Sequence, residues 1–437
     1  MAAPLRVAVV GSGPAGFYAA GALFASDWPV EVDMIERLPT PWGLVRLGVA
    51  PDHPKLKTVS RAFERIADNP GFRFLGNVEV GRDLMHDDLV RLYDALIYAV
   101  GAQTDKRLGI PGEDLAGSWA ATEFVAWYNG HPDYQELQFD LNVERAVVIG
   151  NGNVALDVAR MLALTPEELA PTDTTDAAIA AIGSSSLKEI VLLGRRGPAQ
   201  AAFTPPELAE LGELAGADVV VDPADLEGAE ATDTHSERNL EILREFATRM
   251  PSGKARRVIL RFFRSPVAIL GDERVEGIEI VRNTLDAEQR AVATDEREMI
   301  ACGLVFRSVG YRGVGLPGVP FDQRSGTIAN EGGRVAPGVY VAGWIKRGPT
   351  GVIGTNKKDA TETVERLLAD LTQPKGVSAA DVDAFLDERG VHRVMYAGWL
   401  AIDEVEQAAG VPQGRPRVKL CTWDELLAAA DRLHSSA

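Results

Sequence analysis

Apolar runs separated by helical stretches dominate the start of the chain. Val7 to Val10 form an apolar run typical of a buried parallel strand, and an alanine-rich stretch with helical character follows a group of glycines. A second apolar run, Val30 to Ile35, ends at Glu36. Further strands are predicted at Phe72 to Val80 and at Ala95 to Val100, with helices between them. This alternation predicts βαβ units and a parallel sheet.

The same strand–helix–strand pattern recurs in the middle of the chain. An apolar strand is predicted at Val147 to Ile149, and a helix follows it through Arg160. The matching second strand is predicted at Glu189 to Leu193. It comes late because residues 165–187, rich in Thr, Asp, Ala and Ser, form an insertion. The chain therefore carries a second unit of the same kind.

Later segments are predicted to close both units. Arg256 to Ile269 and Val275 to Asn283 are predicted to be antiparallel strands of the second unit, and Gly303 to Val309 a strand that returns the chain to the first. Gly338 to Ala342 predicts another buried strand, before a helix from about Asn356. The pattern predicts an α/β fold of two Rossmann-like domains, the second inserted into the first. The predicted boundaries are residues 1–105 and 311–437 for the first domain and 106–310 for the second.

Composition limits the classes of function. The 437 residues carry a formal charge of −18, which opposes binding to a nucleic acid. No run of about 18 apolar residues occurs, so we expect no membrane span, and the first strand begins too early for a signal or transit peptide. Cys302 and Cys421 form no C-x-x-C pair, and we therefore expect no disulfide framework, no metal site and no redox dithiol. We expect a monomeric, cytoplasmic protein.

A glycine-rich motif follows the first strand. Gly11, Gly13 and Gly16 match the pattern G-x-G-x-x-G. The first glycine permits the tight turn, the second lets a pyrophosphate approach the backbone, and the third lets the helix pack on the strand. The helix N-terminus offers unpaired N–H groups to the phosphates. Glu36, at the end of the next strand, is expected to bind a ribose diol.

The second motif differs from the first at its tip. Gly150-Asn151-Gly152-Asn153-Val154-Ala155 has alanine in place of the third glycine, and the following strand ends at Arg195 and Arg196 instead of an acid. An acid would repel a 2′-phosphate, whereas a pair of guanidinium groups can bind it. Two solvated arginines beside a loop are the alternative. One unit has an acid at the end of its second strand, and the other has two arginines there. Together these units predict FAD and NADPH as cofactors.

Two further segments are candidates for contact with the flavin. The segment RLPTPWGLVRLGVAPDHPKLK after Glu36 contains four prolines, which predicts irregular structure; we interpret it as a flavin-side loop containing His53, with a plain surface loop as the alternative. In GWIKRGPTGVIGTNKKDA, glycines allow close backbone approach, and the helix that follows would direct its N-terminus at the ligand. Trp344 is predicted to cover the ring, or alternatively to be a core residue at a domain junction.

Two other features have a structural and a functional interpretation. Thr204 and Glu207 have the spacing of a capping box, which would account for Glu207 without chemistry; a role near the nicotinamide is the alternative. Basic residues concentrate between residues 238 and 264 of this acidic chain. Such a group is either a solvated face or a docking surface for an acidic protein. The predicted docking residues are Arg238, Arg244, Arg249, Arg256 and Arg257.

Taken together, these motifs resemble the adrenodoxin-reductase-type ferredoxin–NADP+ reductases, most closely their bacterial members. The resemblance covers essentially the whole chain and is carried by GSGPAGFYAA, PWGLVRLGVAPDHPKLK, GNGNVALDVAR, GRRGPAQAAFTPPELAEL, RSVGYRG and GWIKRGPTGVIGTNKKDA. It departs from the family at Asn151, where many relatives have Gln. The resemblance implies FAD contacts, besides the fingerprint glycines, at Ala15, Glu36, Leu44, Val80, Trp344, Gly351, Val352 and Ile353. It implies NADP contacts at Asn151, Gly152, Asn153, Val154, Arg195, Arg196, Glu207 and Gly351.

The resemblance also implies an activity. His53 and Glu207 match family positions that act near the flavin and the nicotinamide. NADPH would give a hydride to FAD, and electrons would pass singly to a ferredoxin-type iron–sulfur protein. A thioredoxin-reductase-like enzyme is disfavoured because it needs a C-x-x-C motif. The electron-input subunit of a larger enzyme, as in glutamate synthase, usually has cysteine-rich motifs that are missing here, and it is kept as the alternative. A non-catalytic NADPH-binding regulator is the third possibility.

Overall fold

The computed structural model describes residues 4–371 and 373–432. The chain divides into two compact units. Unit 1 comprises the residues up to Val49, His53–Thr104 and the residues from Tyr311 onward, and unit 2 comprises Ala50–Asp52 and Asp105–Gly310. The chain leaves unit 1 after Thr104, whose Oγ1 donates to the Arg312 carbonyl at 3.1 Å. It returns after Gly310, whose carbonyl accepts from the Lys106 amide at 2.9 Å within unit 2.

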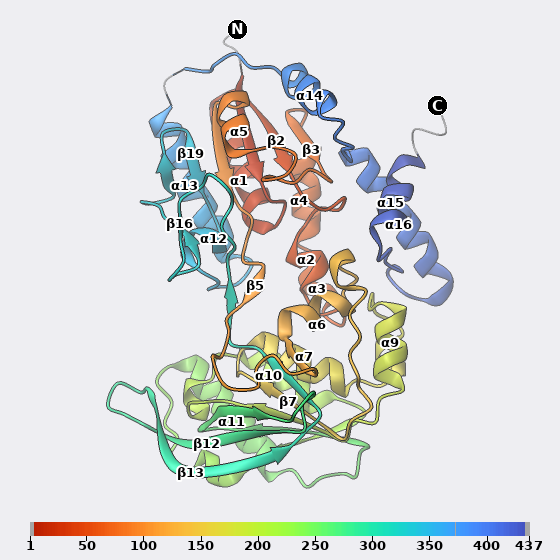
Figure 1. The fold of residues 1–437 in the computed structure, drawn as a ribbon, viewed down its shortest axis with the longest axis vertical. Helices are drawn as coiled ribbons and strands as arrows, with labels where there is room; N and C mark the ends of the chain where they lie inside the picture. The colour runs from red at the N-terminus through yellow and green to blue at the C-terminus, as the bar shows by residue number, and fades with distance from the viewer. Residues whose placement is uncertain (1–3, 372, 433–437) are drawn as a thin grey trace. The chain divides into compact units, whose positions relative to one another are not determined.

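Unit 1 is built on a six-stranded sheet of order β18-β19-β4-β1-β2-β3 (Figure 1). Every neighbouring pair is parallel except β18 and β19. Its strands are β1 (Leu5–Val10), β2 (Val30–Ile35), β3 (Phe72–Leu75), β4 (Ala95–Tyr98), β18 (Arg334–Ala336) and β19 (Val339–Val341), with the short strands β5 (Thr104–Asp105), β15 (Tyr311–Arg312), β16 (Phe321–Asp322) and β17 (Thr327–Ile328) outside it. Its helices are α1 (Pro14–Phe24), α2 (Leu44–Leu47), α3 (Pro54–Lys57), α4 (Ser60–Ala67), α5 (His86–Leu92), α12 (Trp344–Arg347), α13 (Thr355–Asp370), α14 (Ala379–Glu388), α15 (Tyr396–Gly410) and α16 (Trp423–Ala430).

Both faces of this sheet are buried, as the continuous apolar run of β1 requires. Val7 and Val9 lie in a core cluster with residues of α1 and α13, which pack against each other. Ala8 and Val10 point to the other face, where α5 and α14 contribute Leu89 and Leu386. Because successive side chains alternate between faces, one strand supports two cores.

Unit 2 contains a six-stranded, all-parallel sheet of order β6-β14-β7-β8-β10-β9. These strands are β6 (Ser118–Ala120), β7 (Arg145–Ile149), β8 (Glu189–Leu193), β9 (Ala217–Val221), β10 (Arg256–Arg261) and β14 (Leu304–Arg307). The helices are α6 (Ala121–Tyr128), α7 (Asn153–Ala163), α8 (Pro166–Leu169), α9 (Asp176–Gly183), α10 (Pro205–Glu210) and α11 (Thr234–Thr248). An antiparallel sheet of β11 (Arg264–Leu270), β12 (Gly277–Leu285) and β13 (Ala291–Ala301) completes the unit.

The two faces of the unit 2 sheet are covered differently. Val148 packs in a core cluster with side chains of α6, α7 and α11. Val147 and Ile149 pack on the opposite face with Ile278, Ile280 and other side chains of the antiparallel sheet. Helices therefore bury one face, and a second sheet buries the other.

Some predicted elements were wrong in detail. The strand predicted over Arg256 to Ile269 is two strands, because Phe263 has φ +55° and breaks the extended run. Its first half, β10, pairs in parallel with β8 and β9, so the prediction of an antiparallel strand there was wrong; β11 and β12 are antiparallel. The strand predicted to reach Val80 ends at Leu75, shortly before Asn77 at φ +58°.

The proline-rich segment after Glu36 was predicted to contain no regular structure, but it holds the four-residue helices α2 and α3, and a proline stands at the first position of α3. Among the described residues, no helix is long and apolar enough to cross a membrane.

Candidate functional site

The first glycine-rich loop connects β1 to α1 in unit 1. Gly11 has φ +102°, and a Cβ there would lie 2.6 Å from the Ala99 carbonyl oxygen. A Cβ on Gly16 would overlap the Gly11 carbonyl oxygen. Around Gly13, in contrast, a Cβ would meet nothing within 4 Å. Two glycines thus allow close packing, whereas Gly13 faces open space at the N-terminus of α1.

Glu36 is held against this loop. Its Oε2 accepts hydrogen bonds from the Ser12 amide at 3.0 Å and from Ser12 Oγ at 2.7 Å. Its Oε1 accepts from the Leu38 amide at 3.1 Å. The acid at the end of β2 therefore fixes the conformation of the loop. The Ser12 contact was not predicted, because the fingerprint places no requirement on the residue between the glycines.

The proline- and glycine-rich segment crosses the same loop. The Trp42 amide donates to the Ser12 carbonyl at 3.0 Å, and a Cβ on Gly43 would lie 3.0 Å from Gly13 Cα. Trp42 has φ +82°, a strained value for a residue with a Cβ. Its indole Nε1 is buried and has no hydrogen-bond partner among the residues the structure describes. Leu44 follows, at the start of α2.

A segment from the far end of unit 1 reaches the N-terminus of α1. Gly343 has φ +79°, and a Cβ there would lie 2.6 Å from the Ala15 Cβ. The next residue, Trp344, packs its ring 5.3 Å from that of Tyr311. Its indole Nε1 is buried without a hydrogen-bond partner within the described part of the chain. Two buried indole donors in the described part of unit 1 therefore lack an acceptor.

The remaining predicted flavin residues have different surroundings. Gly351 has φ +79°, Val352 is 65% exposed, and Ile353 packs on the α1–α13 core. Val80 is buried in the other core cluster, with Val10. His53 is a buried residue of unit 1 that precedes α3.

The second glycine-rich loop connects β7 to α7 in unit 2. Gly150 has φ +138°, and a Cβ there would overlap the Ser308 carbonyl oxygen. A Cβ on Gly152 would meet nothing within 4 Å. The Asn151 carbonyl accepts from the amides of Ala202 and Phe203, and Asn153 Oδ1 accepts from the Thr204 amide at 2.8 Å. Both asparagines therefore hold residues 202–204 beside the loop, while Val154 packs on the core.

Arg195 and Arg196 follow β8, which lies beside β7. Both residues therefore share the carboxyl edge of the sheet with Gly152. Arg195 is exposed, and its carbonyl accepts from Asn283 Nδ2 at 2.7 Å. Arg196 is half-buried, and its Nη2 donates to the Gln200 carbonyl at 3.4 Å. In the described chain neither guanidinium pairs with a carboxylate, so both charges are available to an anion.

The interpretation of Glu207 as a capping-box residue was wrong. Thr204 is the N-cap of α10, but its side chain makes no capping hydrogen bond. The Glu207 carboxylate lies 3.3 Å from Arg160 Nη1 instead. Arg160 is buried and also pairs with the carboxylates of Asp52, Asp157 and Glu210. Burial lowers the pKa of Arg160, but Asp157 and Asp52 raise it overall. This cluster was not predicted because it joins three segments that lie far apart in sequence.

Comparison with known proteins identifies the family. Residues 5–169 match the family described as "Pyridine nucleotide-disulphide oxidoreductase". The chain is 51% identical to "NADPH-ferredoxin reductase FprA" of Mycobacterium tuberculosis, over 97% of this chain and 98% of the relative. It is 42% identical to "NADPH:adrenodoxin oxidoreductase, mitochondrial" of Arabidopsis thaliana, over 98% and 95%. The structure "Mycobacterium tuberculosis FprA in complex with NADPH" superposes with a TM-score of 0.94 at 50% identity, covering 98% of this chain and 100% of that chain.

The chain belongs to the adrenodoxin-reductase-type ferredoxin–NADP reductases. The resemblance inferred from the motifs is thereby confirmed, as is the α/β fold of two dinucleotide-binding domains. As a member of this reductase family the chain is an oxidoreductase enzyme.

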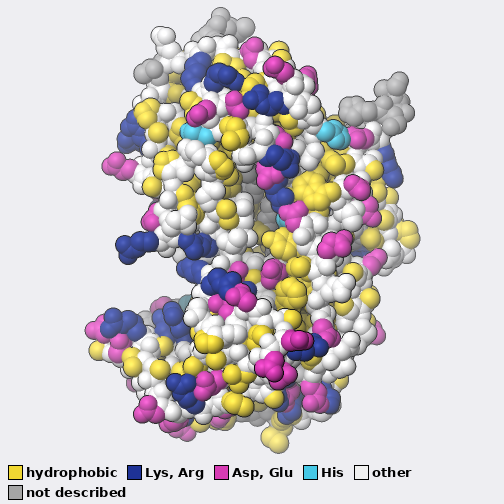
Figure 2. Space-filling model, viewed as in Figure 1, with side chains coloured by type: hydrophobic (Ala, Val, Ile, Leu, Met, Phe, Trp, Pro, Cys, Tyr) yellow, Lys and Arg dark blue, Asp and Glu magenta, His cyan; other side chains and the backbone are white. Residues whose placement is uncertain are grey.

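The basic residues of this reductase are largely engaged within unit 2. Arg238 pairs with Glu241 and Arg249 with Glu245, and Arg257 contacts Glu189. The Arg244 guanidinium donates to the Ala229 carbonyl. Figure 2 shows acidic and basic side chains interspersed on the visible face.

Arg256 was wrongly predicted to be a docking residue. Its guanidinium donates to the carbonyls of Leu162, Leu164 and Ile182 and to Ser185 Oγ. These contacts tie β10 to the C-terminal end of α7 and to α9. Arg256 is therefore a structural residue of the reductase.

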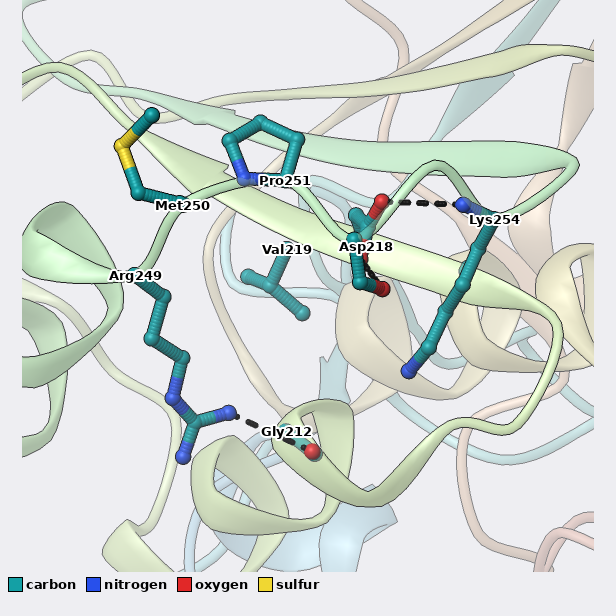
Figure 3. Close-up of a pocket in the computed structure, with 9 residues that line it drawn as sticks. Gly212, Asp218, Val219, Arg249, Met250, Pro251 and Lys254 are labelled. Carbon is teal, nitrogen blue, oxygen red and sulfur yellow. Dashed lines mark hydrogen bonds between the residues drawn. The ribbon is translucent and has the colours of Figure 1, made fainter.

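A surface pocket of about 260 Å³ lies at the amino end of β9 in unit 2 (Figure 3). Asp218 there accepts from Ser252 Oγ at 2.6 Å and from the Gly253 and Lys254 amides. Lys254 Nζ donates to the Leu214 carbonyl at 2.7 Å, and Arg249 Nη1 donates to the Gly212 carbonyl at 3.3 Å. Dinucleotides bind at the carboxyl edge of such sheets. This pocket lies at the opposite edge and is not the nucleotide site of the reductase.

Proposed function

We propose that this chain binds FAD in unit 1 and NADP(H) in unit 2, and that it passes electrons from NADPH to a ferredoxin-type iron–sulfur protein. The observation that carries the proposal is a pair of glycine-rich loops that differ in the charge beside them. The strand after the first loop leads to an acid, and the strand after the second leads to two arginines. Gly13 and Gly152 each face open space at a helix N-terminus. The first loop is held by Glu36, and the second lies at the sheet edge that carries Arg195 and Arg196.

The residues of unit 1 fit FAD. The open face of Gly13 provides room for a pyrophosphate, and the N-terminus of α1 favours its charge. The buried indole donors of Trp42 and Trp344 fit the oxygen and nitrogen acceptors of a flavin dinucleotide. The proposed FAD domain covers residues 1–105 and 311–437. Its proposed contacts are Gly11, Gly13, Ala15, Gly16, Glu36, Leu44, Val80, Trp344, Gly351, Val352 and Ile353.

The residues of unit 2, the proposed NADP domain of residues 106–310, fit NADP(H). Arg195 and Arg196 would bind the 2′-phosphate through charge-assisted hydrogen bonds, and the open face of Gly152 leaves room for the pyrophosphate. Asn151 and Asn153 keep residues 202–204 in place beside that loop. The proposed contacts are Asn151, Gly152, Asn153, Val154, Arg195, Arg196, Glu207 and Gly351.

Bound FAD would supply the coupling of a two-electron hydride donor to a one-electron acceptor. The protein positions the cofactors and controls charge near them. We assign His53 to the flavin side and Glu207 to the nicotinamide side of the reaction. Arg160 orients Glu207 and keeps its carboxylate beside a positive charge.

The proposed electron acceptor is a small acidic iron–sulfur protein. A net charge of −18 repels such a partner over most of the surface, so docking requires local cations. Arg238, Arg244, Arg249 and Arg257 remain the proposed docking residues. A charge-reversal set at these positions is expected to raise KM for the acceptor and to leave flavin reduction by NADPH unchanged.

Reduction by NADPH tests the function directly. The purified protein should be yellow, bleach on anaerobic addition of NADPH, and reduce cytochrome c only when a suitable ferredoxin is added. A protein that binds NADPH but carries no flavin would contradict the proposal. In stopped-flow measurements His53→Ala and Glu207→Gln should slow flavin reduction with FAD still bound, and unchanged rates would remove those two residues from the mechanism.

A further inference from the structure

An arginine at the end of α12 has a charge that unit 1 leaves largely unsatisfied. Arg347 Nη2 donates to Asn356 Oδ1 at 2.9 Å. Its Nε and Nη1 atoms are buried and have no hydrogen-bond partner among the described residues. Buried polar groups in proteins are normally hydrogen-bonded, and buried charged groups especially so. These two donors therefore indicate an acceptor that the chain itself does not supply.

The charge of Arg347 also has no counter-ion in the part of the chain that the structure describes. The preceding residue is different, because Lys346 Nζ lies 2.9 Å from Asp359 Oδ1 and donates to Thr363 Oγ1 at 3.0 Å. Two adjacent cations of the same short helix thus have opposite environments. The Lys346 ammonium is paired within unit 1, whereas the Arg347 guanidinium can still bind an anion.

Arg347 contacts the first turn of α13, and Gly343 connects this place to the first glycine-rich loop. Asn356, its partner, is the second residue of α13, and Asn356 Oδ1 would lie 3.7 Å from a Cβ on Gly343. That same Cβ would lie 2.6 Å from the Ala15 Cβ, in the first turn of α1. Neither α1 nor α13 has an acidic residue in its first turn. The guanidinium therefore lies at the positive end of α13, and Gly343 lies between Asn356 of that helix and Ala15 at the positive end of α1.

We infer that Arg347 is a cofactor-binding residue that donates to an anionic group of FAD. The inference rests on the proposed function, which places FAD in unit 1. Two parts of FAD carry suitable negative charge: the pyrophosphate, and the pyrimidine edge of the reduced flavin ring. A guanidinium binds either group through charge-assisted hydrogen bonds. Binding of FAD would then satisfy the two donors that are unpaired without it.

The unpaired donors distinguish a ligand-binding arginine from a structural one. A structural arginine contributes to the stability of the apoprotein, so its removal lowers the melting temperature with and without ligand. Among the residues that the structure describes, Arg347 has one hydrogen bond and two unmatched donors. Replacing it with a neutral side chain of similar length should leave the apoprotein as stable as before or more stable. The stabilisation that FAD adds to the folded state should then become smaller.

The test compares Arg347→Met, Arg347→Lys and the parent chain as apoproteins, with Arg366→Met as the matched control. Arg366 lies on α13 but is about half-exposed and pairs with Asp370. FAD affinity is measured by quenching of flavin fluorescence, and melting temperatures are measured with and without FAD. We expect Kd for FAD to rise about tenfold or more in Arg347→Met and less in Arg347→Lys, which retains the charge, and to stay unchanged in Arg366→Met.

Titrations with ADP and riboflavin locate the anionic group. Weaker ADP binding in Arg347→Met, with riboflavin unaffected, assigns Arg347 to the pyrophosphate. Weaker riboflavin binding with a lower flavin midpoint potential assigns it to the ring. Two results for Arg347→Met would overturn the inference while the proposed function stands. One is unchanged affinity for FAD, ADP and riboflavin. The other is a melting temperature that falls by the same amount in the apoprotein as in the FAD complex. A parent chain that does not bind FAD would overturn both.

Discussion

Glu36 and Ser12 form a two-point contact in which one carboxylate oxygen accepts both the amide, at 3.0 Å, and the hydroxyl, at 2.7 Å, of the same residue. Ser12 is fully buried, and its carbonyl accepts from Trp42. The acid expected to bind a ribose thus also holds the loop that faces the phosphates. If Glu36 binds FAD as proposed, cofactor binding and loop conformation depend on the same carboxylate.

Removing the Ser12 hydroxyl should therefore affect both stability and FAD affinity. Ser12→Ala loses a hydrogen bond to a charged acceptor, and we expect the free energy of unfolding to fall by about 2 kcal/mol. Kd for FAD should rise several-fold, as measured by fluorescence titration. Ser26→Ala is the control, because Ser26 Oγ donates to the Leu23 carbonyl at the other end of α1. Equal FAD affinity in both variants would show that the Ser12 contact is unimportant for the cofactor.

The open faces of Gly13 and Gly152 predict substitutions that block a ligand without disturbing the fold. Gly13 has φ −75° and Gly152 has φ −104°, which suit any residue, and a Cβ would meet no protein atom within 4 Å. Gly13→Ala should keep the stability of the apoprotein within about 0.5 kcal/mol and weaken FAD binding at least tenfold. Gly152→Ala should do the same to NADPH binding.

Gly11→Ala provides the contrast. Gly11 has φ +102°, and its Cβ would lie 2.6 Å from the Ala99 carbonyl oxygen, so this variant should lose about 2 kcal/mol of stability or more even without FAD. Chemical denaturation of the apoproteins separates the two cases. A Gly13→Ala protein that binds FAD normally would place the pyrophosphate elsewhere.

The arginine pair predicts a change in coenzyme preference. Arg195→Ala with Arg196→Ala removes the cations proposed to hold the 2′-phosphate, at about 1.5–3 kcal/mol for each charge-assisted hydrogen bond. Kd for NADPH should rise roughly 10- to 100-fold or more, while Kd for NADH changes less than about twofold. Arg257→Ala serves as control, because Arg257 pairs with Glu189 in the same sheet. Equal losses for NADPH and NADH would refute the assignment.

A buried ion pair predicts how the stability of unit 1 depends on pH. Arg46 Nη1 and Nη2 donate to both oxygens of Glu406, at 2.9 and 2.5 Å, and Glu406 is fully buried. Burial raises the pKa of the Glu406 carboxyl, but Arg46 and Arg417 lower it overall from 4.5. Because the pKa in the folded state is depressed, this contribution to stability is complete above about pH 4.5 and is lost as the pH falls toward the folded pKa.

Glu406→Gln should therefore lower the free energy of unfolding at neutral pH by about 3–5 kcal/mol and flatten the acid limb of the stability curve. Glu362→Gln is the control, because Glu362 is more than half-exposed and lies 3.8 Å from Lys358. That exposed pair should contribute less than about 1 kcal/mol. Urea titrations between pH 3 and pH 8 measure the free energy of unfolding and its decrease in acid. If stability decreases equally in acid for the parent and Glu406→Gln, Glu406 is not the cause of that decrease.

Local features of the chain were predictable from sequence, because they depend on a few adjacent residues. β2 and β8 match their predicted residues, and β7 nearly so, since apolar runs and glycines determine these elements locally. The carboxyl edge that carries Gly152, Arg195 and Arg196 was predictable for the same reason.

Features that depend on tertiary contacts were not predictable. The positive φ of Phe263 divides a run of residues with good strand propensity, and no proline or glycine marks that break. Glu207 has the spacing of a capping box, but it pairs with Arg160 instead. The two side chains meet only because α10 packs near α7. The pair Arg46–Glu406 joins residues 360 positions apart.

The order in which unit 1 is synthesised has a consequence for its folding. Early and late parts of the chain meet in the Arg46–Glu406 pair, in the packing of α13 on α1 and in the pairing of β19 within the first sheet. The strands and loop of the amino-terminal fingerprint are made before β19, α13 and α15, which complete their surroundings. During translation, the amino-terminal part of unit 1 consequently emerges from the ribosome before its sheet is complete and before Arg46 can pair with Glu406. Unit 2 is continuous except for Ala50–Asp52 and can fold while the ribosome is still translating. Insertion of the FAD proposed for unit 1 should therefore follow the synthesis of α15.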